Sequence, residues 1–251
     1  MKIRKKIPKP APAKLPLYVV GYRGIPPSLD ELTIWYDLQY GGPLVWTDRH
    51  ADGRASATHG PWRTHVLTSL PEKDAAQWQS VLTWDHQQLG VVSPSATTPG
   101  TSTDTVLVAA RLARGLTLLT DGTAFDVTCH EYLNPSDWND RPLTVFVTGD
   151  HVTVQHKEAD DQRSEWFYTL GLTKFGLDEL EMIQPRGLPE ADAIKLLESA
   201  ADEVLRTGRN HTVGSSLDLF AIARTIHVIK HRTAAPTGRT VAFRQIATAP
   251  R

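Results

Sequence analysis

Several features that are typical of other protein classes are scarce in this sequence. It has one cysteine, Cys129, so the chain forms no intramolecular disulfide. Its net charge is −1 at pH 7, so no long-range field attracts nucleic acid or acidic ligands. No stretch approaches the roughly 18 consecutive apolar residues of a membrane-spanning helix. We therefore expect a cytoplasmic protein without a membrane span and without a general affinity for nucleic acid.

The common catalytic and cofactor-binding motifs are also missing. The sequence contains no GxxxxGK[ST] loop, no GxGxxG after its first apparent strand, no GxSxG turn and no CxxC pair. Nucleotide-dependent enzymes and serine hydrolases therefore lose support, although an enzyme of unfamiliar type stays open. His227 and His231 have the i, i+4 spacing of helical metal ligands, but they lack the glutamate of an HExxH motif. We expect no cofactor and no metal.

Positive charge is concentrated at the start of the chain. Residues 1–14 carry six lysines and arginines and no acid, which leaves a net charge of about −7 on the rest. Prolines and lysines stand where a signal peptide needs an apolar segment. We predict a disordered Pro/Ala/Lys leader at residues 1–15 and a single body at 16–251, with a weak seam near 155–163. The basic part of this leader, residues 1–14, is the one segment suited to contact phosphates or anionic lipid.

Apolar periodicity predicts helices and strands in alternation. Helical spacing begins near Ser69, extends over residues 105–114 up to Gly115, and returns after Leu188. Strand patterns occur at residues 17–22, 116–120 and 166–172, and residues 143–147 and 151–155 form a predicted hairpin. Residues 29–36 and 217–229 fit a helix or a strand. Together these segments predict an α+β fold, a mixed and largely antiparallel sheet with about three helices packed on one face.

Two glycines, Gly171 and Gly176, lie in the middle of the stretch around which the other elements are arranged. Either could adopt a positive φ or allow a close backbone approach. One interpretation is a turn that faces a ligand, with binding residues Thr169, Thr173, Lys174 and Asp178. The other interpretation is a core hairpin with a solvated acidic edge.

Titratable side chains supply the candidates for catalysis. Cys129 and His130 are adjacent, so on a strand they would point to opposite faces and could not form a dyad. Paired carboxylates can act as acid and base or bind a cation, although turn chemistry also explains acids near Asp126. The candidates from the whole chain are His65, His86, His130, Asp126 and Glu179. Convergence of two or more of them in a cleft would favour an enzyme.

Two short segments carry a resemblance. The first is residues 169–181, in which Thr-Leu-Gly leads into Phe-Gly-Leu-Asp-Glu. The second is residues 109–115, which precede an Asp-Gly turn. Both segments resemble uncharacterised bacterial α/β domains of unknown function. The resemblance implies a small cytosolic accessory or immunity-type protein that acts by binding. It supplies no catalytic residues.

The leading hypothesis is a non-catalytic module that binds a partner protein. It depends on the absence of a catalytic motif and on aromatic residues in the first third of the chain, which are typical of interfaces and also of cores. The alternative is a hydrolase-like enzyme of unfamiliar type, with a His/Asp pocket between loops. The sequence predicts no oligomeric state.

Overall fold

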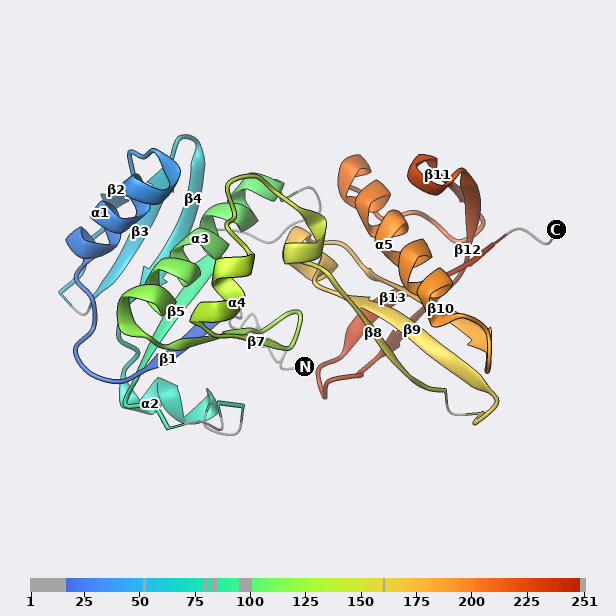
Figure 1. Cartoon of the computed structure of the whole chain (residues 1–251), viewed down its shortest axis with the longest axis horizontal. Helices are drawn as coiled ribbons and strands as arrows, with labels where there is room; N and C mark the ends of the chain where they lie inside the picture. The colour runs from blue at the N-terminus through green and yellow to red at the C-terminus, as the bar shows by residue number, and fades with distance from the viewer. Residues whose placement is uncertain are drawn as a thin grey trace, which may run out of the picture.

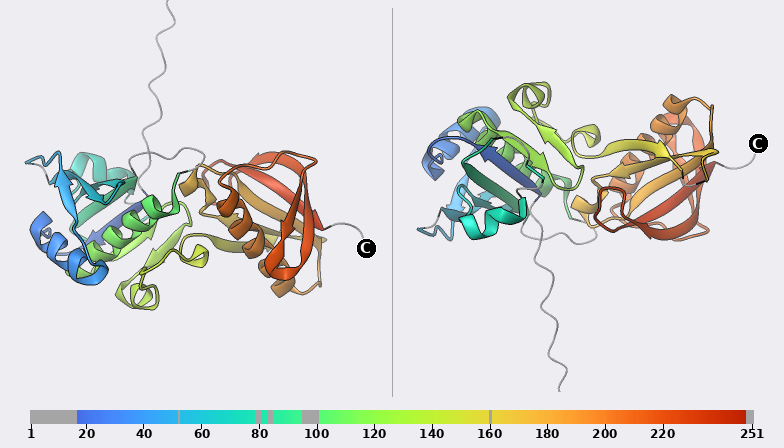
Figure 2. Two further views of the ribbon diagram at one scale, coloured as in Figure 1. Left: turned by 90° about the horizontal axis from the view of Figure 1, so that it is seen from above. Right: turned by 90° about the horizontal axis from the view of Figure 1, so that it is seen from below.

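The computed structural model describes residues 17–51, 53–78, 81–82, 85–94, 101–159 and 161–248. In this part of the chain the strands form two separate sheets, which lie next to each other along the long axis of the molecule (Figures 1 and 2). The predicted leader at residues 1–15 lies outside the described residues. No helix among the described residues is long and apolar enough to cross a membrane.

The first sheet has seven strands and is antiparallel throughout. In spatial order the strands are β2 (Val45–Thr47), β3 (Arg54–His59), β4 (Trp62–Leu67), β5 (Gln88–Pro94), β1 (Tyr18–Tyr22), β6 (Thr123–Asp126) and β7 (Glu131–Leu133). All five residues of β1 are buried, because β5 and β6 pair with its two edges and helices cover its face.

Two long helices, α1 (Leu29–Tyr40) and α3 (Thr103–Thr120), cover the first sheet. Ser28 and Glu31 form a capping box, which starts α1 and settles residues 29–36 as helix. A side chain at Gly115 would come within 2.7 Å of both Leu32 and Trp35. Gly115 therefore lets α1 pack closely on α3 and does not end the helix, so the predicted strand at 116–120 is wrong.

The second sheet has six strands and one long helix, α5 (Glu190–Thr207). In spatial order the strands are β11 (Ser216–Leu219), β12 (Arg224–Ala234), β13 (Val241–Thr248), β10 (Glu179–Pro185), β9 (Ser164–Leu170) and β8 (Thr153–Glu158). Only β10 and β13 pair in parallel among these described strands. The amphipathic α5 ends at Gly208 in the left-handed conformation, and β11 and β12 show that residues 217–229 are mainly strand.

Short helices complete the chain. They are α2 (Glu72–Ala75), η1 (Ala76–Trp78), α4 (Pro135–Asp140), η2 (Thr148–Asp150), η3 (Leu172–Phe175) and η4 (Phe220–Ile222), where η marks a 3-10 helix. The helix predicted from Ser69 begins only after Pro71. The predicted hairpin at 143–155 is also wrong, because η2 and irregular backbone occupy most of it before β8.

The predicted fold class, one mixed sheet with about three helices on one face, is contradicted. The described residues contain two sheets and five α-helices, of which α1 and α3 pack on the first sheet and α5 on the second. Periodicity identifies a strand but not the sheet to which it belongs, since pairing is decided by distant residues. The chain passes between the sheets at residues 134–152, whereas the suggested seam at 155–163 lies in β8 and its connection to β9. The single body at 16–251 stays a prediction, although the main apolar cluster includes residues of both sheets.

Candidate functional site

Asp126, the last residue of β6, organises the turn that follows it. Its Oδ1 accepts hydrogen bonds from the backbone N–H of Thr128 at 3.0 Å, from the Thr128 hydroxyl at 2.7 Å and from the N–H of Cys129 at 3.0 Å. An aspartate that binds the backbone two and three residues ahead stabilises a tight turn. This turn brings the Cys129 thiol to the junction between the two sheets.

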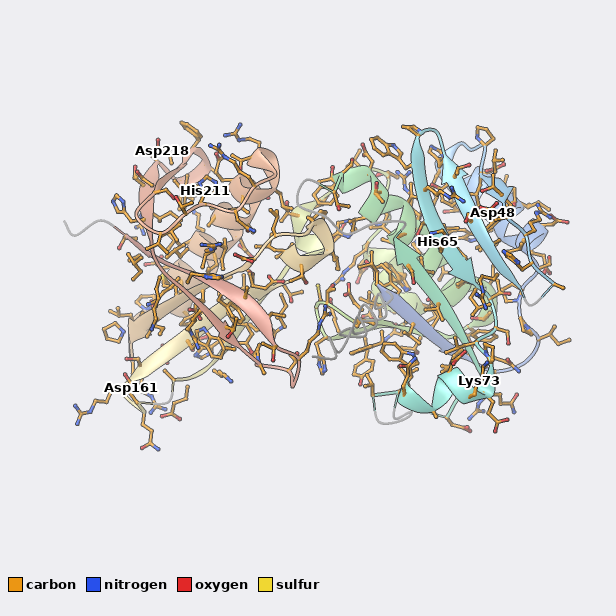
Figure 3. The ribbon with its side chains drawn as sticks, turned by 180° about the vertical axis from the view of Figure 1, so that it is seen from behind. Asp48, His65, Lys73, Asp161, His211 and Asp218 are labelled. Atoms are coloured by element: carbon orange, nitrogen blue, oxygen red, sulfur yellow. The ribbon has the colours of Figure 1, made fainter. Side chains whose placement is uncertain are left out.

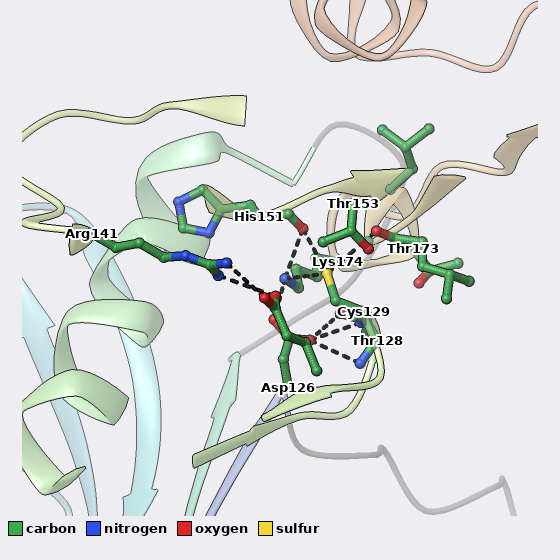
Figure 4. A network of polar contacts seen from close by, with 12 residues as sticks. Asp126, Thr128, Cys129, Arg141, His151, Thr153, Thr173 and Lys174 are labelled. Atoms are coloured by element: carbon green, nitrogen blue, oxygen red, sulfur yellow. Dashed lines mark hydrogen bonds and ion pairs between the residues drawn. The ribbon is translucent and has the colours of Figure 1, made fainter. Parts of the chain in front are cut away.

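Lys174, on η3 beside the second sheet, reaches across that junction with a side chain that is 0 % exposed (Figure 4). Its Nζ donates to Asp126 Oδ2 at 2.5 Å, to the His151 carbonyl at 2.8 Å and to Cys129 Sγ at 3.3 Å. Three acceptors match the three protons of an ammonium group. We call Asp126, Cys129, His151 and Lys174 the junction cluster.

Burial and pairing set the protonation states in the junction cluster. Burial alone would raise the pKa of Asp126, but the Lys174 ammonium and the hydrogen bonds hold that pKa below its ordinary value. Burial would lower the pKa of Lys174, and the Asp126 carboxylate instead raises it. Burial raises the pKa of the Cys129 thiol to about 12. Cys129 is therefore a neutral thiol, which is a poor nucleophile.

His151 contributes its backbone carbonyl to the junction cluster and its ring to the core. The ring stacks on Phe146 with centroids 4.8 Å apart, and neither ring nitrogen has a hydrogen bond within the described part of the chain. Burial, aided by the nearby Lys174 charge, lowers the pKa of His151 to about 3. The ring is therefore neutral near pH 7.

Glu179, at the start of β10, is held by the turn that precedes it. Its carboxylate accepts hydrogen bonds from the Thr169 hydroxyl at 2.8 Å and from three backbone N–H groups, those of Gly171 at 2.9 Å, Leu172 at 3.2 Å and Thr173 at 3.1 Å. Gly171 has φ 125°, and a side chain there would lie 2.2 Å from the His151 carbonyl. Burial raises the pKa of Glu179, while these donors act in the opposite direction.

The four residues predicted to bind a ligand at this turn all have partners inside the protein. Thr169 binds Glu179, Lys174 binds Asp126, and Thr173 is partly buried with its N–H on Glu179. Asp178 accepts from Arg244 Nε at 2.7 Å and lies 3.6 Å from His231 Nε2. The structure thus gives each of these four residues a partner within the protein, which for Thr173 is made through the backbone N–H.

The five catalytic candidates occupy different places. Asp126 and Glu179 belong to two separate hydrogen-bond networks, and neither carboxylate has a described hydrogen bond to a histidine side chain. His130 contacts Asp126 only through the backbone, where its N–H donates to the Asp126 carbonyl at 2.8 Å. His65 is on β4 with Nδ1 3.0 Å from Ser56 Oγ, His86 precedes β5, and His130 packs against Phe125 (Figure 3 shows His65). The candidates do not form a common cleft, and both carboxylates are buried away from solvent.

The second sheet carries an open groove on one of its faces. It has a volume of about 410 Å³ and is lined by Lys157, Ala159, Asp161, Trp166, Ile183, Lys230, Arg232, Ala234, Ala235, Pro236 and Gln245. We call it the Trp166 groove. The volume is within the range of small-ligand sites.

Cations surround the aromatic wall of this groove. Lys157 Nζ lies 4.6 Å and the Arg232 guanidinium carbon 4.8 Å from the centroid of the Trp166 ring. Arg232 is fixed by two hydrogen bonds to the buried Glu181, at 2.8 and 2.6 Å. The distances of 4.6 and 4.8 Å from the two cations to the Trp166 ring are short enough for cation–π attraction. The groove therefore has a basic rim over the Trp166 ring, which is itself only 7 % exposed.

Sequence reasoning missed the Trp166 groove. Strand alternation was the one available signal, because it places Lys157 on one face of β8 and Trp166 on one face of β9. The register that sets Lys157 opposite Trp166 and Arg232 opposite Phe243 is a property of the folded sheet.

Comparison with known proteins adds no assignment to this geometry. No protein-family model, no curated protein and no solved structure matches the chain.

Proposed function

We propose that this protein is a binding module that holds an acidic segment of a partner protein in the Trp166 groove. The observation that carries the proposal is the aromatic, basic lining of a groove of about 410 Å³. Apolar side chains of the partner would contact Ile183, which is exposed, and the small exposed part of the Trp166 ring, and its carboxylates would face the lysines. No reaction is part of the proposal.

The charges of the groove favour an acidic occupant. Lys157 and Lys230 are exposed, and no ion pair among the described residues includes either of them. The single acid of the lining, Asp161, already accepts hydrogen bonds from Arg163 N–H and from Ser164. The leader at residues 1–14, with six positive charges, would be repelled. The occupant is therefore expected to come from another chain.

The edge of the second sheet provides a way to hold an extended peptide. β8 is the last strand of this sheet and pairs with β9 alone among the described strands. An edge strand has backbone N–H and C=O groups on its free side, which a partner strand can bind. A peptide added along β8 would pass beside Lys157.

The alternative, a hydrolase-like enzyme, has less support. Asp126 and Glu179 are buried, and their oxygens already accept hydrogen bonds. A substrate would have to displace these bonds before either carboxylate could take a proton. A cytoplasmic location belongs to the binding proposal, because the one cysteine is a free thiol.

The test is the binding of a fluorescein-labelled peptide in which glutamate alternates with leucine, measured by fluorescence anisotropy. A peptide with lysine in place of glutamate is the charge control. We expect the glutamate peptide to bind, the lysine peptide not to bind, and affinity to fall as salt rises.

Variants locate the binding. The double variant Lys157→Gln/Lys230→Gln should lose most of the affinity, and Lys195→Gln, an exposed lysine on α5, should not. Equal binding of both peptides, or an unchanged affinity in the double variant, would show that the groove does not select acidic segments.

A further inference from the structure

Three side chains with metal-binding chemistry come together on the α5 side of the second sheet. They are His156 on β8, Glu165 on β9 and Glu190, the first residue of α5. His156 Nε2 lies 3.9 Å from a Glu165 oxygen, and Nδ1 lies 4.0 Å from a Glu190 oxygen. One ligand atom can be chosen from each residue so that all three lie within 4.8 Å of one another.

Glu165 provides a second, independent observation that points to a bound cation at this place. Its side chain is 14 % exposed, and its Oε2 is buried without a hydrogen bond in the described part of the chain. No lysine or arginine forms an ion pair with Glu165 or Glu190 among the described residues. A buried carboxylate oxygen without a donor is unfavourable, and a bound cation would supply the missing interaction.

The histidine is held in place before any ion binds. The His156 ring stacks on Phe167, with centroids 4.4 Å apart and an angle of 12° between the rings. His156 and Glu165 are on paired strands, with Glu158 opposite Glu165 and His156 opposite Phe167. Glu190, whose side chain is 58 % exposed, is the ligand with the most freedom to move as the three residues close on an ion.

We propose that His156, Glu165 and Glu190 bind one divalent transition-metal ion of the zinc type. One imidazole nitrogen with two carboxylates suits Zn²⁺, and three protein ligands leave a position for water or a fourth donor. Bond lengths of about 2.0–2.2 Å require ligand atoms closer than the present 3.9 and 4.0 Å, so one carboxylate turns toward the chosen nitrogen.

This site is independent of the Trp166 groove. His156 and Lys157 are consecutive on β8, so their side chains point to opposite faces of the sheet. The metal proposal can therefore fail while peptide binding succeeds, and the reverse also holds.

The test is calorimetric titration of the chelator-treated full chain with Zn²⁺ at pH 7.5. We expect one equivalent to bind, and affinity to fall at least about 10-fold in Glu190→Gln and in His156→Gln. His227→Gln, on β12, is the matched control and should bind as the unchanged protein does.

A second measurement separates this site from adventitious binding to the other histidines. Zn²⁺ should raise the melting temperature of the unchanged protein and of His227→Gln, but not that of Glu190→Gln. Glu190 is exposed, so its replacement by glutamine leaves the fold intact. Absence of binding by the unchanged protein, or binding by Glu190→Gln and His156→Gln as tight as that of the unchanged protein, would overturn the proposal.

Discussion

The two sheets bury different kinds of side chain. In the first sheet α3 packs on β1, β4 and β5, and its buried side chains are almost all apolar. The buried polar residues on the strands of this sheet are mostly small hydroxyls, such as Ser56 and Thr64. The second half buries three charged side chains, Lys174, Glu179 and Glu181, whereas the first half buries two, Arg114 and Asp126. Buried charges are therefore more frequent in the second half, and the Asp126–Lys174 pair joins the two halves.

This difference predicts different responses to substitution. Loss of a methylene from an apolar core removes burial and leaves a cavity. Loss of one partner from a buried charged pair leaves the other charge without compensation, which is costlier per atom removed. Glu181, for example, depends on two hydrogen bonds from Arg232.

The largest effect is expected for Lys174→Met. This change leaves Asp126 buried and unpaired, so we expect a loss of about 3–5 kcal/mol in the free energy of unfolding. Urea denaturation followed by circular dichroism measures it. The double variant Lys174→Met/Asp126→Asn should lose less than the single variant, because no unpaired charge remains. A double variant that is the less stable of the two would show that the pair is not the cause.

The second effect is a pH dependence from His151. Its folded pKa is about 3 and its ordinary value is 6.5, so protons bind the unfolded state more readily. This contribution to stability is complete above pH 6.5 and is lost as pH falls from 6.5 toward 3. The slope is at most about 1.4 kcal/mol per pH unit, or roughly 3 kcal/mol between pH 6.5 and 4.5.

Urea denaturation at several pH values between 7.5 and 4.5 measures this slope. His151→Phe keeps an aromatic ring against Phe146 and keeps the backbone carbonyl that Lys174 binds. The slope between pH 6.5 and 4.5 should be shallower in this variant. An unchanged slope would assign the pH dependence to other groups.

Local signals in the sequence predicted part of the local structure. The strand β9, the positive φ of Gly171 and Gly176, and the helix α5 follow from short-range chemistry. Residues 29–36, which fitted a helix or a strand, form a helix that begins at the capping box of Ser28. The failure at Gly115 has a distant cause, because the glycine serves contact with Leu32 on another helix. The number of sheets also escaped prediction, since strand pairing depends on residues far apart in sequence.

The candidate sites follow the same rule. Asp126, Cys129 and Lys174 each stood out as single residues, but 48 positions separate Asp126 from the lysine that neutralises it. His156, Glu165 and Glu190 have no motif spacing, and only the pairing of β8 with β9 and the start of α5 unite them. Sequence spacing reveals a site only when the ligands share one element.

A smaller effect is expected at Glu179, where the partners are hydrogen-bond donors and not a cation. Glu179→Gln places an amide NH₂ against backbone N–H groups, which should cost about 1–3 kcal/mol. Urea denaturation compares it with Thr169→Val, which removes one donor to Glu179, leaves the three backbone N–H groups and takes away the hydroxyl that accepts from Leu180 N–H. We expect Thr169→Val to be the milder change. The reverse order would mean that the hydroxyl, and not the backbone N–H groups, determines the stability of this turn.

The smallest effects are expected for exposed ion pairs, and they test whether the difference between the two halves is confined to buried groups. Arg186 and Glu158 form a pair at 2.9 Å on the second half, with side chains 61 % and 48 % exposed, and Arg23 and Asp85 form an exposed pair on the first half. Exposed ion pairs contribute about 0–1 kcal/mol, because water and salt screen them. Arg186→Ala and Arg23→Ala should therefore change stability equally little. If Arg186→Ala alone lost as much stability as Lys174→Met, the second half would depend on charge pairing at its surface as well. The contrast between the halves would then not be confined to buried groups.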